Sequence, residues 1–160
     1  MSQPRYTVIP RTLCLLRRGD RWLLFRRGPD RRLWPNLHSG IGGHVEEGEG
    51  ILAAARRELR EEAGVQAASL RLVGVIHEME ASQGVAVFVF AGQAASADVR
   101  PCAEGTPVWA TLEEALCLPL VADLPLILRR VLAMGPHDPP FLARSRLDAA
   151  GNPILVFEDD

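Results

Sequence analysis

Long apolar runs are missing from this 160-residue sequence. Arginines interrupt the hydrophobic stretches near the N-terminus, so neither a membrane span nor a signal peptide is predicted. We therefore expect a cytoplasmic protein without membrane contact. An excess of charge of one sign is missing as well, because the formal net charge is only -2. Such a chain has no general attraction for nucleic acid, which argues against an extended polynucleotide as its partner.

Cysteine is scarce, with only Cys14, Cys102 and Cys117 in the chain. An odd number at wide spacing, without the pairs that bind zinc, favours free or buried thiols in a reducing compartment. Internal repeats and low-complexity tracts are also absent from the sequence. With 48% hydrophobic residues, the chain is long enough to bury the core of one ordinary domain.

The most informative stretch covers positions 50–63 and predicts one helix. Alanine, leucine, arginine and glutamate dominate it, proline is absent, and Gly64 follows where a left-handed C-terminal cap is expected. An apolar stripe recurs at helical spacing, at Leu52, Ala55, Leu59 and Ala63. We expect this stripe to pack against a sheet.

Three carboxylates of this helix, Glu58, Glu61 and Glu62, share one face, because steps of three and four residues return to the same side. The helix dipole disfavours each anion in the C-terminal half by roughly 0.3–1 kcal/mol, and Glu58 also repels Glu62. A hard divalent cation such as magnesium would offset this cost, since it takes oxygen ligands and joins carboxylates to substrate phosphates. The alternative is a solvated surface on which neighbouring arginines neutralise the glutamates.

The glycine-rich segment before this helix and the helix itself together match the motif of one enzyme family. The matching positions are Gly43, Glu49, Arg57, Glu58, Glu61, Glu62 and Gly64, with apolar Leu59 and Val65 between them. This pattern resembles the Nudix box of the Nudix hydrolases, and no position departs from it. The resemblance implies an α/β/α sandwich around a mixed sheet. It also implies hydrolysis of a nucleoside diphosphate linked to a further group, with Mg²⁺, or Mn²⁺ in its place, as the cofactor.

The resemblance also assigns roles at the reaction centre. Glu58, Glu61 and Glu62, with the carbonyl of Gly42, would hold one or more metal ions that neutralise the diphosphate and orient water. One carboxylate takes the proton of that water, and Glu58 is the first candidate. Glu104 is an alternative base or a further metal ligand, because similar enzymes often carry a carboxylate on the loop before the corresponding strand. A solvated turn residue is the other interpretation of Glu104.

Further positions of the box are expected to support this chemistry. In the resemblance, Glu49 steadies Arg57, and Arg57 takes part in catalysis by holding Glu58 in place. Gly43 follows a strand whose glycines admit a metal or a phosphate close to the backbone. Gly64 ends the helix.

The rest of the chain predicts two hairpins, further strands and two more helices. The expected strands cover residues 6–16, 22–26, 70–77, 85–91, 106–110, 141–147 and 153–157, and the expected helices begin at residues 111 and 124. Residues 1–135 are expected to form the catalytic domain. Residues 136–160 are expected to form a C-terminal β-hairpin extension packed on the same domain.

Three positions are assigned to the substrate. Arg27 belongs to four arginines around a turn, which indicates either phosphate contact or a solvated loop. The chain most resembles the oxidised-purine diphosphatases, in which an asparagine precedes the Gly-x-Gly-Gly segment and an aspartate near the last core helix meets the purine edge. Here Ser39 replaces the asparagine, which should weaken base selection, and Asp123 is the aspartate. The alternative role for Asp123 is to cap the helix that begins at Leu124.

The resulting prediction is a nucleoside triphosphate diphosphatase that acts on a small nucleotide such as 8-oxo-dGTP. It would release a nucleoside monophosphate and pyrophosphate, as a monomer or a homodimer. One alternative is a hydrolase of ADP-ribose, a nucleotide sugar or a dinucleoside polyphosphate. The other is a nucleotide-sensing module that binds its ligand without turnover.

Overall fold

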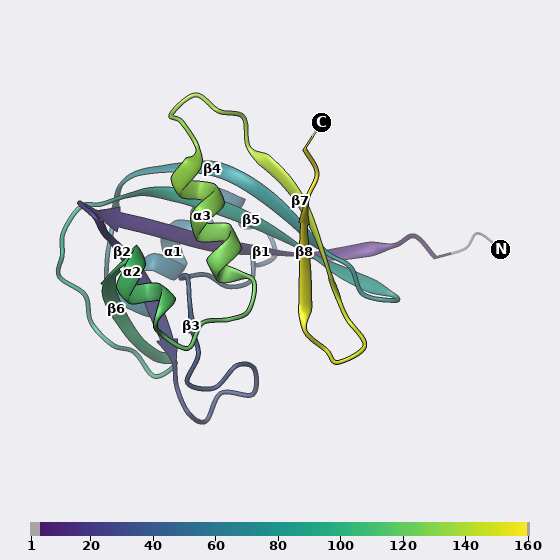
Figure 1. Cartoon of the computed structure of the whole chain (residues 1–160), viewed down its shortest axis with the longest axis horizontal. Helices are drawn as coiled ribbons and strands as arrows, with labels where there is room; N and C mark the ends of the chain where they lie inside the picture. Colours follow the sequence, from purple (N-terminus) through teal and green to yellow (C-terminus); the bar gives the residue numbers. More distant parts are fainter. Residues whose placement is uncertain (1–3, 160) are drawn as a thin grey trace.

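A curved mixed sheet with helices on both faces organises the chain in the computed structural model, which describes residues 4–159 (Figure 1). The strands are β1 (Thr7–Arg18), β2 (Arg21–Arg27), β3 (His38–Ser39), β4 (Ala67–Glu78), β5 (Gln83–Ala94), β6 (Gly105–Thr111), β7 (Phe141–Leu147) and β8 (Pro153–Phe157). The helices are α1 (Ile51–Ala63), α2 (Leu112–Leu116) and α3 (Leu124–Ala133). All the strands and helices expected from the sequence are present, with ends shifted by a few residues.

The strands follow the order β3-β2-β1-β5-β4-β7-β8, and β6 pairs with β2. Two contacts are parallel, β1 with β5 and β4 with β7, and the other pairs are antiparallel. β5 therefore lies in the middle of the sheet, in agreement with its almost wholly apolar sequence.

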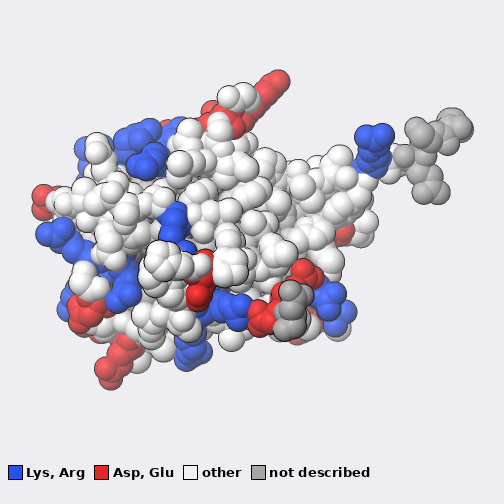
Figure 2. Space-filling view, turned by 90° about the horizontal axis from the view of Figure 1, so that it is seen from above, with Lys and Arg blue, Asp and Glu red and all other residues white. Residues whose placement is uncertain are grey.

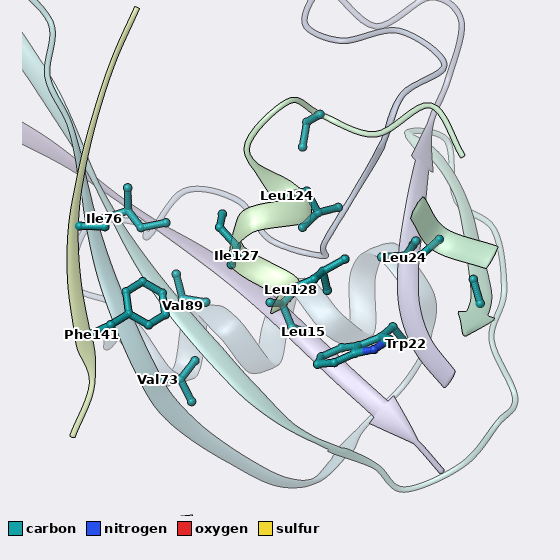
Figure 3. Close-up of a cluster of buried hydrophobic side chains, with 14 residues drawn as sticks. Leu15, Trp22, Leu24, Val73, Ile76, Val89, Leu124, Ile127, Leu128 and Phe141 are labelled. Carbon is teal, nitrogen blue, oxygen red and sulfur yellow. The ribbon is translucent and has the colours of Figure 1, made fainter. Parts of the chain in front are cut away.

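The helices divide the core into two layers. α3 lies in front of the sheet and α1 behind it in Figure 1. Alternate residues of a strand point to opposite faces, so Leu15 joins the cluster under α3, whereas Cys14 and Leu16 join the cluster under α1. Figure 3 shows Leu124 and Leu128 of α3 directed toward this front layer. The predicted α/β/α sandwich is confirmed.

Helix α1 has the predicted cap but a shorter buried stripe. Gly64 adopts the left-handed conformation, with φ 65°, and its N–H donates to the carbonyls of the last turn. The prediction that Leu52 packs on the sheet is wrong, because its side chain is 44% exposed. Full burial along α1 begins only at Ala54, and in the first turn the partly buried Ile51, in place of Leu52, packs against the cluster that contains Ala55 and Leu59.

The C-terminal hairpin of β7 and β8 extends the same sheet beyond β4. Its first residue, Phe141, is 4% exposed and lies in the core under α3. Gly74 of β4 is its register partner, and a Cβ atom built at Gly74 would come within 2.4 Å of the Phe141 ring. The absent side chain therefore makes room for the ring.

The surface carries interspersed positive and negative side chains around uncharged areas (Figure 2). The sequence contains no lysine, so every positive side chain is an arginine. Among residues 4–159, no helix is both long and apolar enough to cross a membrane.

Candidate active site

The last turn of α1 brings Glu62 against the glycine-rich segment that precedes the helix. Its side chain is buried, and one oxygen accepts a hydrogen bond of 3.1 Å from the N–H of Gly42. Burial, above all, raises the pKa of Glu62 to about 8, and the charges of Glu58 and Glu104 act in the same direction. A carboxyl group that is buried beside other carboxylates favours a bound cation.

Arg57 connects Glu58 to Glu49. Its Nε and Nη2 atoms donate to the two oxygens of Glu49 over 2.8 and 3.0 Å, and Nη1 donates to Glu58 over 2.8 Å. The side chain of Glu58 is only 12% exposed, and this burial raises its pKa while the bond from Arg57 opposes the rise. The structure thus places Arg57 where it can orient Glu58, and its part in catalysis stays a prediction.

Glu61 differs from the other two carboxylates of its helix face. Its side chain is 58% exposed and accepts a hydrogen bond of 3.0 Å from Arg57. Glu58 and Glu62 therefore lie beside the glycine segment, whereas Glu61 lies at the edge open to solvent.

Gly42 and Gly43, which precede the helix, are closely surrounded by other groups and leave no room for a side chain. A Cβ atom at Gly43 would lie 2.3 Å from a carboxylate oxygen of Glu58, and one at Gly42 would lie 1.9 Å from the carbonyl of Thr12. The carbonyls of Ile41 and Gly43 accept hydrogen bonds from β1. Between them, the carbonyl of Gly42 has no such partner in the described part of the chain.

These groups suit a hard divalent metal ion in their chemistry. The donors are the carboxylates of Glu58 and Glu62 and the unpaired carbonyl of Gly42, and all of them offer the oxygen atoms that magnesium prefers. In residues 4–159, no three side chains of His, Cys, Asp and Glu already converge on one point. A backbone carbonyl and ordered water would therefore have to complete the coordination.

Glu104 lies on the turn before β6, close enough to influence the pKa values of the carboxylates on α1. Its charge contributes to the raised pKa of both Glu58 and Glu62. Its own side chain is half exposed and accepts a bond of 3.2 Å from Arg31. Glu104 therefore faces the site from solvent, tethered by an arginine of the 28–37 loop.

A pocket next to Gly42 brings the three predicted substrate residues together. Arg27, Ser39 and Asp123 all line it, and its atom-free volume is about 660 Å³ including the open mouth. Arg27 is also held in place, because its Nε donates to the carbonyl of Leu33 over 2.8 Å. The arginines at 26, 31 and 32 do not line this pocket, so Arg27 is the one of the four directed into it.

Asp123 points into this pocket and does not cap α3 with its side chain. It occupies the position before Leu124, but its carboxylate makes no capping hydrogen bond. Burial raises its pKa. The cap interpretation is therefore wrong for the side chain, which stays available to a ligand.

One backbone connection explains why Ser39 and Asp123 meet. The N–H of His38 donates to the carbonyl of Pro119 over 2.8 Å, and the N–H of Val121 donates back to His38 over 3.0 Å. The short strand β3 is thereby joined to the segment that leads into α3.

Three further pocket residues were not found from the sequence. Thr12 has a buried hydroxyl without a hydrogen-bond partner, and Glu78 has a pKa raised by burial and by the charge of Asp123. Trp34 has the positive φ of 51°, which a bulky residue adopts only under constraint. Only Trp34 had a sequence signal, an aromatic residue among the loop arginines. Thr12 lies within an expected strand and Glu78 directly after one, and nothing in the sequence marked either as a ligand contact.

Comparison with known proteins agrees with this geometry. A family model described as the NUDIX domain matches residues 8–131. The NAD-capped RNA hydrolase NudC of Pseudomonas aeruginosa is 40% identical over 65 residues, which are 41% of this chain and 22% of that protein. The chain thus spans less than a quarter of the length of this curated relative.

Solved structures share the fold. The MutT protein of Bacillus halodurans has a TM-score of 0.78 at 22% identity, over 96% of this chain and 99% of that chain. The Nudix domain of NrtR from Shewanella oneidensis, solved with ADP ribose, has a TM-score of 0.69 at 15% identity, over 80% of this chain and 88% of that chain. Since the family model covers more than half of the sequence, the chain belongs to the Nudix family.

Proposed function

We propose that this Nudix hydrolase is a nucleoside triphosphate diphosphatase that prefers an oxidised purine such as 8-oxo-dGTP. It cleaves the substrate to the monophosphate and pyrophosphate and thereby cleanses the cytoplasmic nucleotide pool. Nudix enzymes act on small nucleotide substrates, generally with divalent metal ions, typically Mg²⁺. The observation that carries the proposal is the position of Asp123, in a pocket that also contains Gly42 of the box entry.

The chain's own residues divide the reaction between them. Glu58, Glu62 and the carbonyl of Gly42 would hold the magnesium, which when bound neutralises phosphate charge and lowers the pKa of water. Arg27, which also lines the pocket, binds a phosphate oxygen. Glu58, oriented by Arg57, takes the proton of the attacking water.

In this proposal, Asp123 and Ser39 select the base. Asp123 meets the purine edge with a carboxyl group, and Ser39 offers one hydroxyl in place of a longer amide. The side-chain hydroxyl of Ser39 already donates to the carbonyl of Gly40 over 2.8 Å. Selection for the oxidised base therefore rests mainly on Asp123.

The substitution Asp123→Ala tests this assignment. We expect the ratio of kcat/KM for 8-oxo-dGTP over dGTP to fall by about tenfold or more, because a hydrogen bond to a charged group is lost. Magnesium dependence should persist, and stability should change little because no side-chain cap is removed. The exposed turn residue Asp20 gives a control, Asp20→Ala. An unchanged ratio in Asp123→Ala would refute the role of this residue.

A second candidate is the hydrolysis of a dinucleotide or of ADP-ribose. The observation in its favour is the 40% identity with the NAD-capped RNA hydrolase over 65 residues. Assay of the purified protein with magnesium against 8-oxo-dGTP, dGTP, ADP-ribose, NAD and a dinucleoside polyphosphate separates the candidates. Preference for ADP-ribose or NAD would replace the first proposal, and binding without turnover of any of them would indicate a sensing module.

A further inference from the structure

A second hollow lies on the α3 face of the sheet, toward the C-terminal end of that helix. Its atom-free volume is about 750 Å³ including its mouth. In the register of the sheet, Arg17 of β1 is opposite Gln93 of β5, and Arg71 of β4 is opposite Ala91 of β5. The two arginines thus stand on either side of β5, two strand spacings apart across the sheet and two residues apart along it, which places their backbones about 12 Å apart. The small side chain of Ala91 between them leaves the space open.

The two guanidinium groups have no acidic partner. Neither Arg17 nor Arg71 forms an ion pair within residues 4–159, and no Asp or Glu lines the hollow. Arg71 donates one bond of 2.9 Å to the carbonyl of Gly135, which leaves its other donors free. The Nε atom of Arg17 is buried and has no hydrogen-bond partner. A buried donor without an acceptor is costly and rare in folded proteins, so a missing ligand is indicated.

Apart from the polar Ser69 and Gln93, the remaining wall of the hollow is apolar. Leu15, Leu70 and Val131 line it, together with Trp22, whose ring centroid lies 5.0 Å from the guanidinium carbon of Arg17. Figure 3 shows Leu15 and Trp22 next to each other beneath α3. This contact places the cation of Arg17 over the face of the indole ring. The hollow therefore combines two unpaired cations with a hydrophobic surface.

We propose that this hollow is a binding site for a phosphate monoester that carries a compact apolar group. The planar donors of arginine match phosphate oxygens, and the apolar wall accepts the attached group. The site is separate from the reaction centre, because no residue lining it also lines the nucleotide pocket. It does not depend on the substrate proposed above.

Phenyl phosphate is a suitable probe, because a monoester has no phosphoanhydride bond for the enzyme to cleave. We expect its titration into isotope-labelled protein to shift the indole N–H signal of Trp22 and the amide signals of Arg71 and Gln93. Inorganic phosphate should shift the same signals with weaker affinity, since it makes no contact with the apolar wall. Shifts confined to Gly42 and its neighbours, or no shifts at all, would overturn the proposal.

Substitutions distinguish this site from general charge attraction. Arg17→Gln and Arg71→Gln should each weaken phenyl phosphate binding by about tenfold or more. Arg17→Lys should lie between the parent and Arg17→Gln, because it keeps the charge and loses the Nε donor. The control is Arg18→Gln, which removes an equal charge from the exposed next residue, outside the hollow. Equal affinity in Arg18→Gln and both glutamine variants of the hollow would refute the site, and thermal unfolding of each variant verifies its fold.

Discussion

Arg57 forms hydrogen bonds to three glutamates of the Nudix box. Its guanidinium has five N–H donors, and five hydrogen bonds use them: two go to Glu49 and one each to Glu58, Glu61 and the carbonyl of His44. These bonds also raise the pKa of the arginine, so it stays charged. A side chain with all its donors engaged is rigid, which is what the orientation of a catalytic carboxylate requires.

Substitution of the two carboxylates beside the glycine segment tests their predicted roles in the reaction. Glu58→Gln and Glu62→Gln should each lower kcat by about 100-fold or more, because the amide keeps the size and loses charge and basicity. Circular dichroism should show an intact fold. Glu47→Gln, in the exposed part of the same loop, is the matched control. Activity within a few-fold of the parent in either variant would remove that residue from the reaction centre.

The Glu49–Arg57 pair predicts a pH dependence of stability. The bonds from Arg57, followed by the bond from the N–H of Glu46, lower the pKa of Glu49 from 4.5 to about 2. Because the folded value is lower than the unfolded one, the stabilisation is present above pH 4.5 and is lost as the pH falls toward 2. Glu49→Gln should therefore melt below the parent at pH 7, and this difference should shrink by pH 2. A difference that stays constant with pH would contradict the assignment.

Among the elements, the C-terminal hairpin lies at the edge of the sheet but contributes a side chain to the hydrophobic core. β7 pairs with β4 in parallel, and Phe141 fills the space that Gly74 leaves. The ring also contacts Phe157 of β8 edge to face, with centroids 5.3 Å apart. The hairpin is thereby attached to the core under α3, the helix that begins beside the pocket lined by Asp123.

Phe141→Ala tests this attachment. We expect a loss of about 3–5 kcal/mol in the free energy of unfolding, as for other buried aromatic residues. Leu142→Ala, at the next residue of the strand, is the control and should cost little, because that side chain is 54% exposed. Equal losses in both variants, measured by denaturant unfolding, would show that the hairpin does not depend on the Phe141 contact.

For the whole molecule, we expect metal binding to increase folding stability. Glu58 and Glu62 are held near each other and near Glu104, and burial raises the pKa of both of the first two. The folded state therefore carries an electrostatic cost that the unfolded chain does not. A cation that binds only the folded state relieves this cost and shifts the folding equilibrium by mass action.

Magnesium should accordingly raise the melting temperature of the parent, increasingly with its concentration. The double variant Glu58→Gln, Glu62→Gln should lose this dependence, because it lacks both carboxylates of the site. Glu47→Gln should keep it. Differential scanning calorimetry with and without a chelator measures the effect. If the double variant and the parent respond equally, the ion binds elsewhere.

The parts of this protein that depend on local contacts could be predicted from the sequence. The box, the helix that ends at Gly64, the capping box at Thr111 and the two hairpins are set by contacts within a few residues, as is the nearness of Glu58 to Glu62 along α1. Helix geometry and turn chemistry depend on nearest neighbours, so they can be read without the fold. The roles of these residues in the reaction stay predictions.

The pocket depends on contacts between residues that are far apart in the sequence. It forms where His38 meets Pro119, which are 81 positions apart, and where β1 pairs with β5. For this reason Thr12 and Glu78 gave no signal in the sequence, and Asp123 fitted a helix cap as well as a ligand contact. The exposure of Leu52 could not be predicted from the sequence either. A periodic pattern indicates the direction of a side chain along the helix, but it does not show where the opposing sheet ends.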